Sequence, residues 1–255
     1  SLPTVAPRDA DDLRSQILAG KDPLGSEFCQ VRSSGLRRVQ GATYTPAPLV
    51  EAMLAWASAQ VTPLRVVDPG AGSGRFTLRA SQVFPCAKLI AIEPDPAAAL
   101  LLRANLAVHG LTERVSVRVS DYRDMSLPAI EGPTLFLGNP PYVRHHQITP
   151  TWKAWLRDRA ASFGLTASGL AGLHVYFFVA TAGLARTGDC GVFVTASEWL
   201  DVNYGKLVRE LFLGPLGGQR LLLLDPKSLP FEDATTTAVI AGFCPGSRPR
   251  SIQIS

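Results

Sequence analysis

Short apolar runs alternate with longer helical segments from residue 64 onward, and this alternation constrains the fold more than any other feature of the chain. The first five runs that we expect to form strands are residues 65–67, 88–92, 115–119, 134–137 and 191–196. Strands separated by helices of this length form right-handed βαβ units, which build a parallel sheet with helices on both faces. Two further runs, 219–224 and 237–243, are close together, which favours an antiparallel hairpin at the sheet edge. The expected class is α/β, with a seven-stranded, mostly parallel sheet.

Length and composition limit the possible functions only broadly. A chain of 255 residues with 46% hydrophobic residues is long enough for one sizeable core. The net charge of +4 is compatible with a polyanionic partner but does not indicate one. The four cysteines lack metal-ligand spacing, so we expect reduced, mostly buried thiols and no metal site. Because no apolar run approaches the roughly 20 residues of a membrane span, we expect a cytoplasmic protein without a membrane partner.

Residues 1–40 form an expected leader that differs from the rest of the chain. Residues 9–18 predict a short helix capped by an aspartate, and Arg32, Arg37 and Arg38 follow it. We interpret this leader as a helix plus an ordered arm. Its arginines form either a solvated face or a contact with DNA.

A helix start is expected where Thr45 and Pro46 precede a run of apolar residues at helical spacing. Thr45 would cap this helix and proline would occupy its first turn. The free backbone amides of such a helix start can hold a carboxylate.

Acidic residues end the first three expected strands. Asp68 precedes Gly70 and Gly72, which leave room for the backbone to approach a ligand, and an acid at this point favours a cationic amino group over a phosphate. Glu93 can accept hydrogen bonds from both hydroxyls of a ribose, and Asp121 can accept a hydrogen bond from an adenine amino group. Open parallel sheets bind ligands at this edge. The implied ligand has an amino acid part, a ribose and an adenine, and S-adenosylmethionine has all three.

The fourth strand ends on Asn139-Pro140-Pro141-Tyr142, which is suited to holding a planar amine. The prolines have fixed φ angles and lack N–H groups. If the Asn139 side-chain oxygen and the Pro140 carbonyl accept the two amine hydrogens, the nitrogen lone pair is directed outward for attack on a methyl group. Positioning and hydrogen bonding then provide the activation, and the step requires neither a strong base nor a metal.

Five stretches in this order resemble the gamma-arrangement DNA methyltransferases, the N6-adenine enzymes of bacterial restriction–modification systems. The stretches are residues 43–46, 68–74, 92–95, 120–122 and 139–142. The resemblance implies a Rossmann-like S-adenosylmethionine-dependent methyltransferase domain over residues 41–255, with double-stranded DNA as the partner. It implies a catalytic set of Asn139, Pro140, Pro141, Tyr142 and Phe231. It implies a cofactor-binding set of Thr43, Tyr44, Thr45, Pro46, Asp68, Gly70, Gly72, Glu93, Asp121, Tyr122 and Asn139.

Two rings are expected to hold the target base. Tyr142 would stack on an adenine that is flipped out of the duplex, because a base inside the duplex cannot reach a buried methyl donor. Phe231 lies where the family places a second aromatic wall, although a core role is also open to it.

Three alternatives stay open at this stage. The same loop serves enzymes that methylate a protein glutamine amide or an RNA base amine, because any planar amine fits the same two acceptors. A catalytically silent module that binds DNA or a partner protein is a third possibility. The chain carries no evident target-recognition region, so sequence choice could come from a removed segment, another subunit or residues 143–168. We therefore expect the chain alone to bind S-adenosylmethionine but to methylate DNA weakly or without sharp sequence choice.

Overall fold

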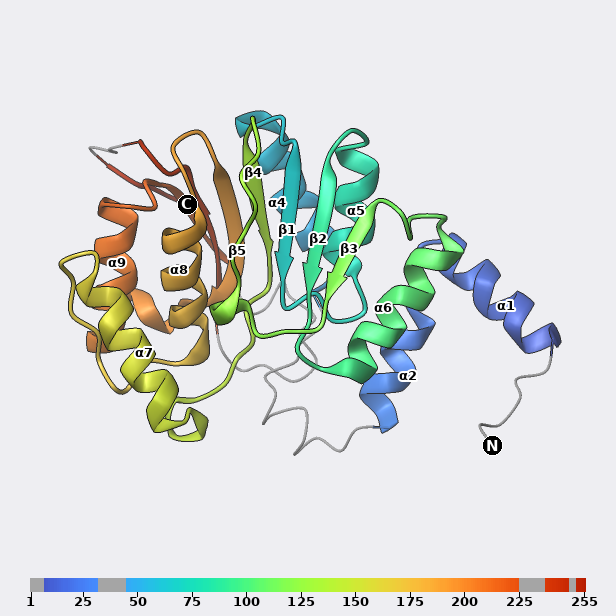
Figure 1. The fold of residues 1–255 in the computed structure, drawn as a ribbon, viewed down its shortest axis with the longest axis horizontal. Helices are drawn as coiled ribbons and strands as arrows, with labels where there is room; N and C mark the ends of the chain where they lie inside the picture. Colours follow the sequence, from blue (N-terminus) through green and yellow to red (C-terminus); the bar gives the residue numbers. More distant parts are fainter. Residues whose placement is uncertain (1–6, 32–44, 225–236, 248–250) are drawn as a thin grey trace.

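The structure, a computed structural model, describes residues 7–31, 45–224, 237–247 and 251–255 (Figure 1). These residues contain one sheet of eight strands in the order β3-β2-β1-β4-β5-β7-β6-β8. The strands are β1 (Arg65–Pro69), β2 (Lys88–Ile92), β3 (Val115–Arg118), β4 (Thr134–Gly138), β5 (Cys190–Ala196), β6 (Gly218–Leu224), β7 (Ala238–Phe243) and β8 (Gln253–Ile254). The strands from β1 to β5 pair in parallel, whereas β7 is antiparallel to both β5 and β6. The expected α/β class and the antiparallel edge are confirmed.

The eighth strand is a difference from the expected seven. β8 pairs in parallel with β6, and the Leu223 amide donates a 2.9 Å hydrogen bond to the Ser255 carbonyl. Both residues of β8 are exposed. A two-residue edge strand held by backbone groups leaves no side-chain pattern, which is why the sequence did not predict it.

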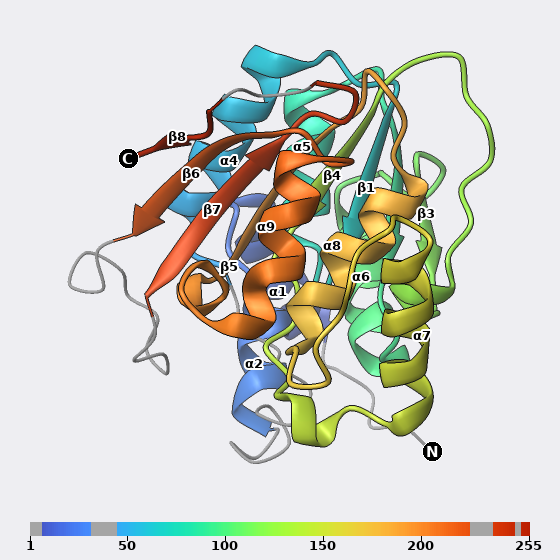
Figure 2. The same ribbon diagram turned by 90° about the vertical axis from the view of Figure 1, so that its left-hand side faces the viewer.

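Two helical layers cover the sheet. One face packs against α4 (Ala47–Gln60), α5 (Arg75–Val83) and α6 (Pro96–Val108). The other face packs against α7 (Pro150–Ala161), α8 (Leu173–Leu184) and α9 (Lys206–Leu213), which lie in front of the sheet in Figure 2. The short 3₁₀ helices are η1 (Tyr122–Asp124), η2 (His145–Gln147), η3 (Ser197–Leu200) and η4 (Asn203–Gly205). None of the helices that the structure describes is long and apolar enough to cross a membrane.

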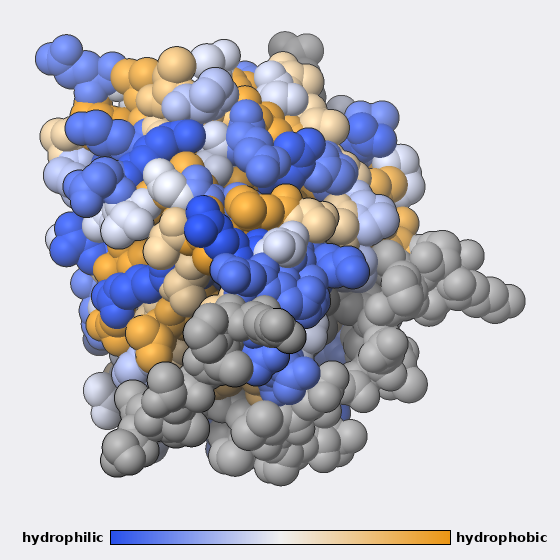
Figure 3. All heavy atoms as spheres, turned by 90° about the vertical axis from the view of Figure 1, so that its right-hand side faces the viewer, coloured by the Kyte–Doolittle hydropathy of each residue, from blue (hydrophilic) through white to orange (hydrophobic). Residues whose placement is uncertain are grey.

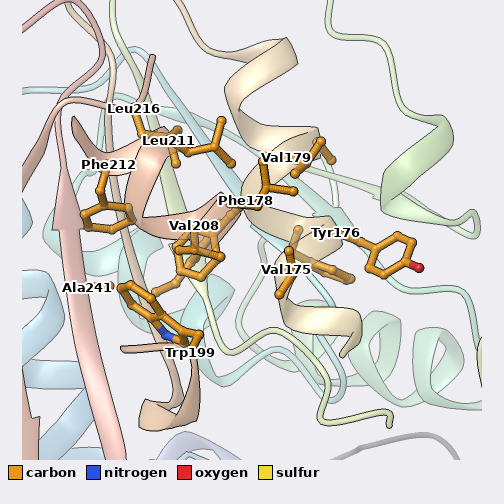
Figure 4. Close-up of a cluster of buried hydrophobic side chains, with 14 of the residues drawn as sticks. Val175, Tyr176, Phe178, Val179, Trp199, Val208, Leu211, Phe212, Leu216 and Ala241 are labelled. Atoms are coloured by element: carbon orange, nitrogen blue, oxygen red, sulfur yellow. The ribbon is translucent and has the colours of Figure 1, made fainter. Parts of the chain in front are cut away.

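An aromatic cluster fixes α8 and α9 against the sheet (Figure 4). Phe178 of α8 lies 5.8 Å from the Trp199 ring and 5.6 Å from the Phe212 ring, centroid to centroid. The Trp199 indole donates a 3.0 Å hydrogen bond to the Thr195 hydroxyl, so its polar atom is satisfied in the core. This packing explains why α8 is apolar on nearly all sides.

The leader contributes two helices, α1 (Pro7–Leu18) and α2 (Pro23–Val31), which both contact α6 and lie beside it in Figure 1. The helix expected over residues 9–18 is therefore present, and α2 was not expected. Figure 3 shows hydrophilic and hydrophobic side chains interspersed over the described surface at this end of the molecule. Arg32, Arg37 and Arg38 lie outside the described residues.

The cysteines correct one expectation. Cys190 is buried, but Cys244 is only partly buried and Cys86 is exposed, and all three are free thiols. Of these three cysteines only Cys190 is therefore buried, because Cys86 lies in the loop before β2 and Cys244, which packs against the core, follows the end of β7.

Candidate active site

The predicted site residues converge at the carboxyl edge of the sheet. Asp68 is the fourth residue of β1, Glu93 directly follows β2, and Asn139 directly follows β4. The register pairs Pro69 with Ile92 across β1 and β2, so these strand ends are adjacent. Asp121 follows β3 by a few residues, next to the end of β2. The parallel strands thus bring together residues that are separated by up to 71 positions in the sequence.

The glycine loop leaves its backbone open to a ligand at one position. Gly70 and Gly72 have φ angles of +76° and +56°, which side chains rarely adopt. A Cβ atom added to Gly70 would lie 3.7 Å from Pro141 Cδ and 4.0 Å from the Asn139 carbonyl oxygen. A Cβ atom added to Gly72 would meet nothing within 4 Å. The loop therefore touches the catalytic loop on one side and is accessible on another.

Asp68 is a buried carboxylate with one unused oxygen. Its side chain is 2% exposed, and Oδ2 accepts a 2.6 Å hydrogen bond from the Thr77 hydroxyl. Oδ1 has no hydrogen-bond partner in the described part of the chain. Burial raises the pKa of Asp68 to about 7; the bonds from Thr77 oppose this, and the charge of Glu93 adds to it. A ligand that brings a cationic group to Oδ1 would relieve this burial cost, which fits the predicted role.

Glu93 faces the glycine loop. Its Oε2 accepts a 2.8 Å hydrogen bond from the Gly72 amide, and its Oε1 accepts a 2.9 Å bond from the Asp95 amide. The side chain is 8% exposed. Its carboxylate therefore lies beside the open backbone of Gly72, at the point predicted for a ribose.

Asp121 has a strong partner that the sequence did not reveal. Its two oxygens accept bonds of 2.8 and 2.5 Å from the Arg123 guanidinium in a fork arrangement. The Arg123 guanidinium also lies 3.5 Å above the Trp152 ring of α7. Arg123 thus links the predicted adenine-binding acid to the helix that follows the catalytic loop. Its position two residues after Asp121 was the available signal.

Tyr122 lies in the core rather than at the open edge. It is 2% exposed, its ring packs 5.2 Å from the Phe177 ring, and its hydroxyl lies 2.9 Å from the Thr181 hydroxyl. Burial raises the pKa of the Tyr122 phenol. A cofactor contact from this residue stays a prediction, and the side chain as placed supports the sheet instead.

The catalytic loop begins where β4 meets the end of β1. A Cβ atom added to Gly138 would lie 3.2 Å from the Pro69 carbonyl and 3.4 Å from Asp68 Oδ1, so only glycine fits here without a shift. Asn139 is partly buried, and its Nδ2 donates a 3.1 Å hydrogen bond to the Thr45 hydroxyl. Pro140 is buried, while Pro141 and Tyr142 are partly buried. Burial raises the pKa of Tyr142.

The predicted cap at Thr45 is wrong. Helix α4 has Pro46 as its N-cap, with no side-chain capping bond, and the Thr45 hydroxyl is bonded to Asn139 instead. Thr45 is 4% exposed, so its hydroxyl is directed inward by the packing. Thr43, Tyr44 and Phe231 lie outside the described residues, so their predicted roles stay predictions.

A cavity of about 350 Å³ lies away from this site. Its lining includes Arg65, Arg159 and Arg186, and Arg65 is the first residue of β1, at the opposite end of the strand from the glycine loop. Among the described residues there is no group of three or more side chains that could hold a metal ion.

Solved structures share this architecture. The methyltransferase subunit of a type I restriction-modification system from Streptococcus thermophilus aligns with a TM-score of 0.67 at 18% identity, covering 83% of this chain and 47% of that chain. The strand order, the glycine loop and the acids at the strand ends define the fold of a class I S-adenosylmethionine-dependent methyltransferase. The fold thus agrees with the methyl donor expected from the sequence.

Sequence comparisons show which methyltransferases the chain is similar to. The family model described as Eco57I restriction-modification methylase matches residues 134–215. The Type II methyltransferase M.XamI from Xanthomonas campestris pv. amaranthicola is 48% identical over 258 aligned residues, covering 98% of this chain and 47% of that protein. Over nearly its whole length the chain is thus similar to a restriction–modification methyltransferase, which confirms the resemblance seen in the sequence.

A more distant relative matches a smaller region. A tRNA1(Val) (adenine(37)-N6)-methyltransferase from Porphyromonas gingivalis is 34% identical over 102 residues, covering 38% of this chain and 40% of that protein. The chain spans less than half the length of either sequence relative.

Proposed function

We propose that this chain transfers a methyl group from S-adenosylmethionine to the N6 amine of adenine in DNA, as part of a restriction–modification system. The position of Asn139 carries the proposal. Asn139 directly follows β4, and its backbone carbonyl oxygen lies 4.0 Å from a Cβ atom built on Gly70. An amine held by this loop would therefore be next to a ligand held by the glycine loop, which is the arrangement that direct transfer requires.

The donor side of the site fits the amino acid and ribose parts of the proposed cofactor. Asp68 Oδ1 would accept from the cationic amino group, and Glu93 would accept from the ribose hydroxyls. Asp121, whose carboxylate is held by Arg123, would accept from the adenine amine. When bound, S-adenosylmethionine supplies an electrophilic methyl group on a sulfonium centre.

The acceptor side orients the target amine. The Asn139 side-chain oxygen and the Pro140 carbonyl would accept the two amine hydrogens, so that the lone pair of the nitrogen is directed toward the methyl group. Transfer would form a bond from the nitrogen to the methyl carbon and break the bond from that carbon to sulfur, which would keep the electron pair as a neutral thioether. The nitrogen would then lose one proton to solvent. Tyr142 would stack on the flipped base, with Phe231 as the second wall.

The choice of adenine over cytosine is the finer part of this proposal. The N4 amine of cytosine is also planar and would fit the same two acceptors. The helix-start stretch at residues 43–46 and the aromatic at Phe231 resemble the adenine enzymes, and the relative from Porphyromonas gingivalis is named as an adenine-N6 enzyme. That relative also makes an RNA adenine the second candidate substrate.

The test is to incubate the protein with unmethylated genomic DNA and methyl-labelled S-adenosylmethionine, and to separate the nucleosides by mass spectrometry. We expect label in N6-methyladenine. Label in N4-methylcytosine would overturn the choice of base, and label only in an RNA substrate would favour the second candidate. Methylation-sensitive sequencing of the same DNA would show whether these 255 residues alone methylate DNA weakly or without sharp sequence choice.

Variants separate the catalytic role from folding. Asn139→Ala should abolish transfer while leaving cofactor affinity nearly unchanged, because Asn139 acts on the amine. Asn203→Ala is the matched control, since Asn203 is exposed at the start of η4. Full activity in Asn139→Ala would reject the proposed mechanism.

A further inference from the structure

Thr45 connects the catalytic loop to a network that reaches the leader. Its hydroxyl accepts the 3.1 Å hydrogen bond from Asn139 Nδ2. With the nitrogen of the amide bonded to Thr45, the Oδ1 atom of Asn139 is on the other side of the amide group, as an acceptor for an amine must be. Thr45 therefore holds the nitrogen end of the Asn139 amide in this arrangement.

Arg75 connects Thr45 to the leader. Arg75 is the first residue of α5, and its Nη1 donates a 3.2 Å hydrogen bond to the Thr45 carbonyl. Its Nε donates a 2.9 Å hydrogen bond to Asp22 Oδ2. The guanidinium thus connects the end of the glycine loop, the start of α4 and the start of α2.

Asp22 is built into this position. Its side chain is 10% exposed, and besides Arg75 it accepts a 2.6 Å bond from the Ser73 hydroxyl of the glycine loop and a 2.9 Å bond from the Gly25 amide. A Cβ atom on Gly25 would lie 2.4 Å from Asp22 Oδ2, so the first turn of α2 leaves room for this carboxylate only because residue 25 is glycine. The Arg75 side chain is 33% exposed, but the Asp22 carboxylate is shielded, and a charge-assisted bond to a shielded carboxylate fixes geometry better than one to a solvated carboxylate.

We propose that Asp22, acting through Arg75 and Thr45, positions the Asn139 amide, so that leader helix α2 is a working part of the active site. This inference rests on the proposed function, in which the Asn139 oxygen accepts from the target amine. Asp22, Arg75 and Thr45 are positioning residues, because none of them needs to touch the substrate amine. The leader is then more than an arm beside the catalytic domain.

The test compares two substitutions at Thr45 and one in the leader. Thr45→Val removes the hydroxyl but keeps the shape, and Thr45→Ser keeps the hydroxyl. We expect kcat to fall on the order of tenfold in Thr45→Val and in Asp22→Ala, and to be restored in Thr45→Ser. Asp12→Ala is the matched control, because Asp12 is an exposed leader acid that accepts from Gln16 within α1.

A double-mutant cycle tests the connection itself. If Asp22 acts through Thr45, the combined variant should lose little more activity than either single variant. Fully additive losses, or an Asp22→Ala enzyme with the control's kcat, would overturn the proposal. If thermal unfolding shows that Asp22→Ala is not folded, Asp22→Asn replaces it in the cycle.

A second readout does not depend on activity. In protein labelled with ¹⁵N-asparagine, the Asn139 side-chain amide signals are assigned by their loss in Asn139→Ala. These signals should shift in Thr45→Val and Asp22→Ala and stay in place in Asp12→Ala. Unshifted Asn139 signals would reject the proposed connection from Asp22 to Asn139. A wild-type protein that transfers no methyl group would reject the proposed function instead, and the shifts would still report on this connection.

Discussion

The hydroxyl of Thr77 donates a 2.6 Å hydrogen bond to Oδ2 of Asp68, across the glycine loop that separates β1 from α5. Thr77 is fully buried, so this bond is shielded from water. It holds the carboxylate at the end of β1, where Oδ1 is buried without a hydrogen-bond partner among the described residues. Thr77 therefore shapes the proposed site of the methyl donor, although it would not contact the methyl donor itself.

Stability should decrease as the pH rises toward and through neutrality because of Asp68. Its pKa is about 7 in the folded protein against 3.8 for an ordinary aspartate, so between these values the folded state holds a proton that the unfolded state lacks. The free energy of unfolding should then fall by up to about 1.4 kcal/mol per pH unit in this window from this group alone. Urea unfolding of wild type and Asp68→Asn from about pH 5 to about pH 8 measures the difference. Parallel pH profiles would contradict the assignment.

Cofactor affinity should change in the opposite direction with pH. A cationic amino group prefers the ionised Asp68, so the affinity for S-adenosylmethionine should rise as the pH passes through about 7. Asp68→Asn should bind more weakly and lose this dependence. Isothermal titration calorimetry across the same range checks both points.

Removing the Thr77 hydroxyl should weaken the same site without touching the ligand. In Thr77→Val the carboxylate loses its bond, which costs about 1–3 kcal/mol of stability. The bonds from Thr77 lower the pKa of Asp68, so their loss should raise that pKa further and shift the pH dependence of binding upward. Thr112→Val is the control, because Thr112 is exposed. Thr77→Ser should behave like wild type.

Arg123 should couple cofactor binding to α7. Arg123→Ala removes the paired bonds to Asp121 and the contact with the Trp152 ring, so the Kd for S-adenosylmethionine should rise about 5- to 30-fold. Arg123→Lys should recover only part of the lost affinity, because a lysine cannot donate the two parallel hydrogen bonds to Asp121. Trp152 emission should respond to the cofactor in wild type and not in Arg123→Ala. Arg118→Ala, an exposed position at the end of β3, is the control.

His174 should make the protein sensitive to acid. Burial lowers the pKa of His174 to about 4, below its usual 6.5. The unfolded state therefore binds a proton that the folded state excludes, and the stability that is present above pH 6.5 should be lost as the pH falls toward 4. His174→Leu should flatten this loss, whereas His146→Leu at an exposed position should not. Denaturant midpoints across this range provide the comparison.

Strands near the site were predictable because buried strands leave continuous apolar runs. The run at 88–92 matches β2, and the run at 134–137 misses only Gly138 of β4. Helix α7 was missed because its exposed face is polar, although Trp152, Leu156 and Ala160 recur at helical spacing on its buried side. In such a helix the periodicity is informative and the average composition is not.

The acids and Asn139 were predictable for a different reason. Their positions at strand ends are a property of the chain's local pattern, and parallel strands then bring those ends together. The partners of these residues depend on how helices from distant segments pack, so Thr77, Arg75 and Asp22 left no local signal. Tyr122 shows that position in the sequence does not settle where a side chain lies. It directly follows Asp121, but its side chain is in the core.

The strand order also sets the sequence in which the site can form as the chain is synthesised. Strands β1, β2 and β3 are consecutive neighbours, so the donor half can assemble from residues 65–121. β4 must then add to the other side of β1, and only this pairing brings Asn139 beside the glycine loop. In a nascent chain the donor half could therefore form before Asn139 is in place, and the proposed methyl transfer would have to wait until strands are paired on both sides of β1.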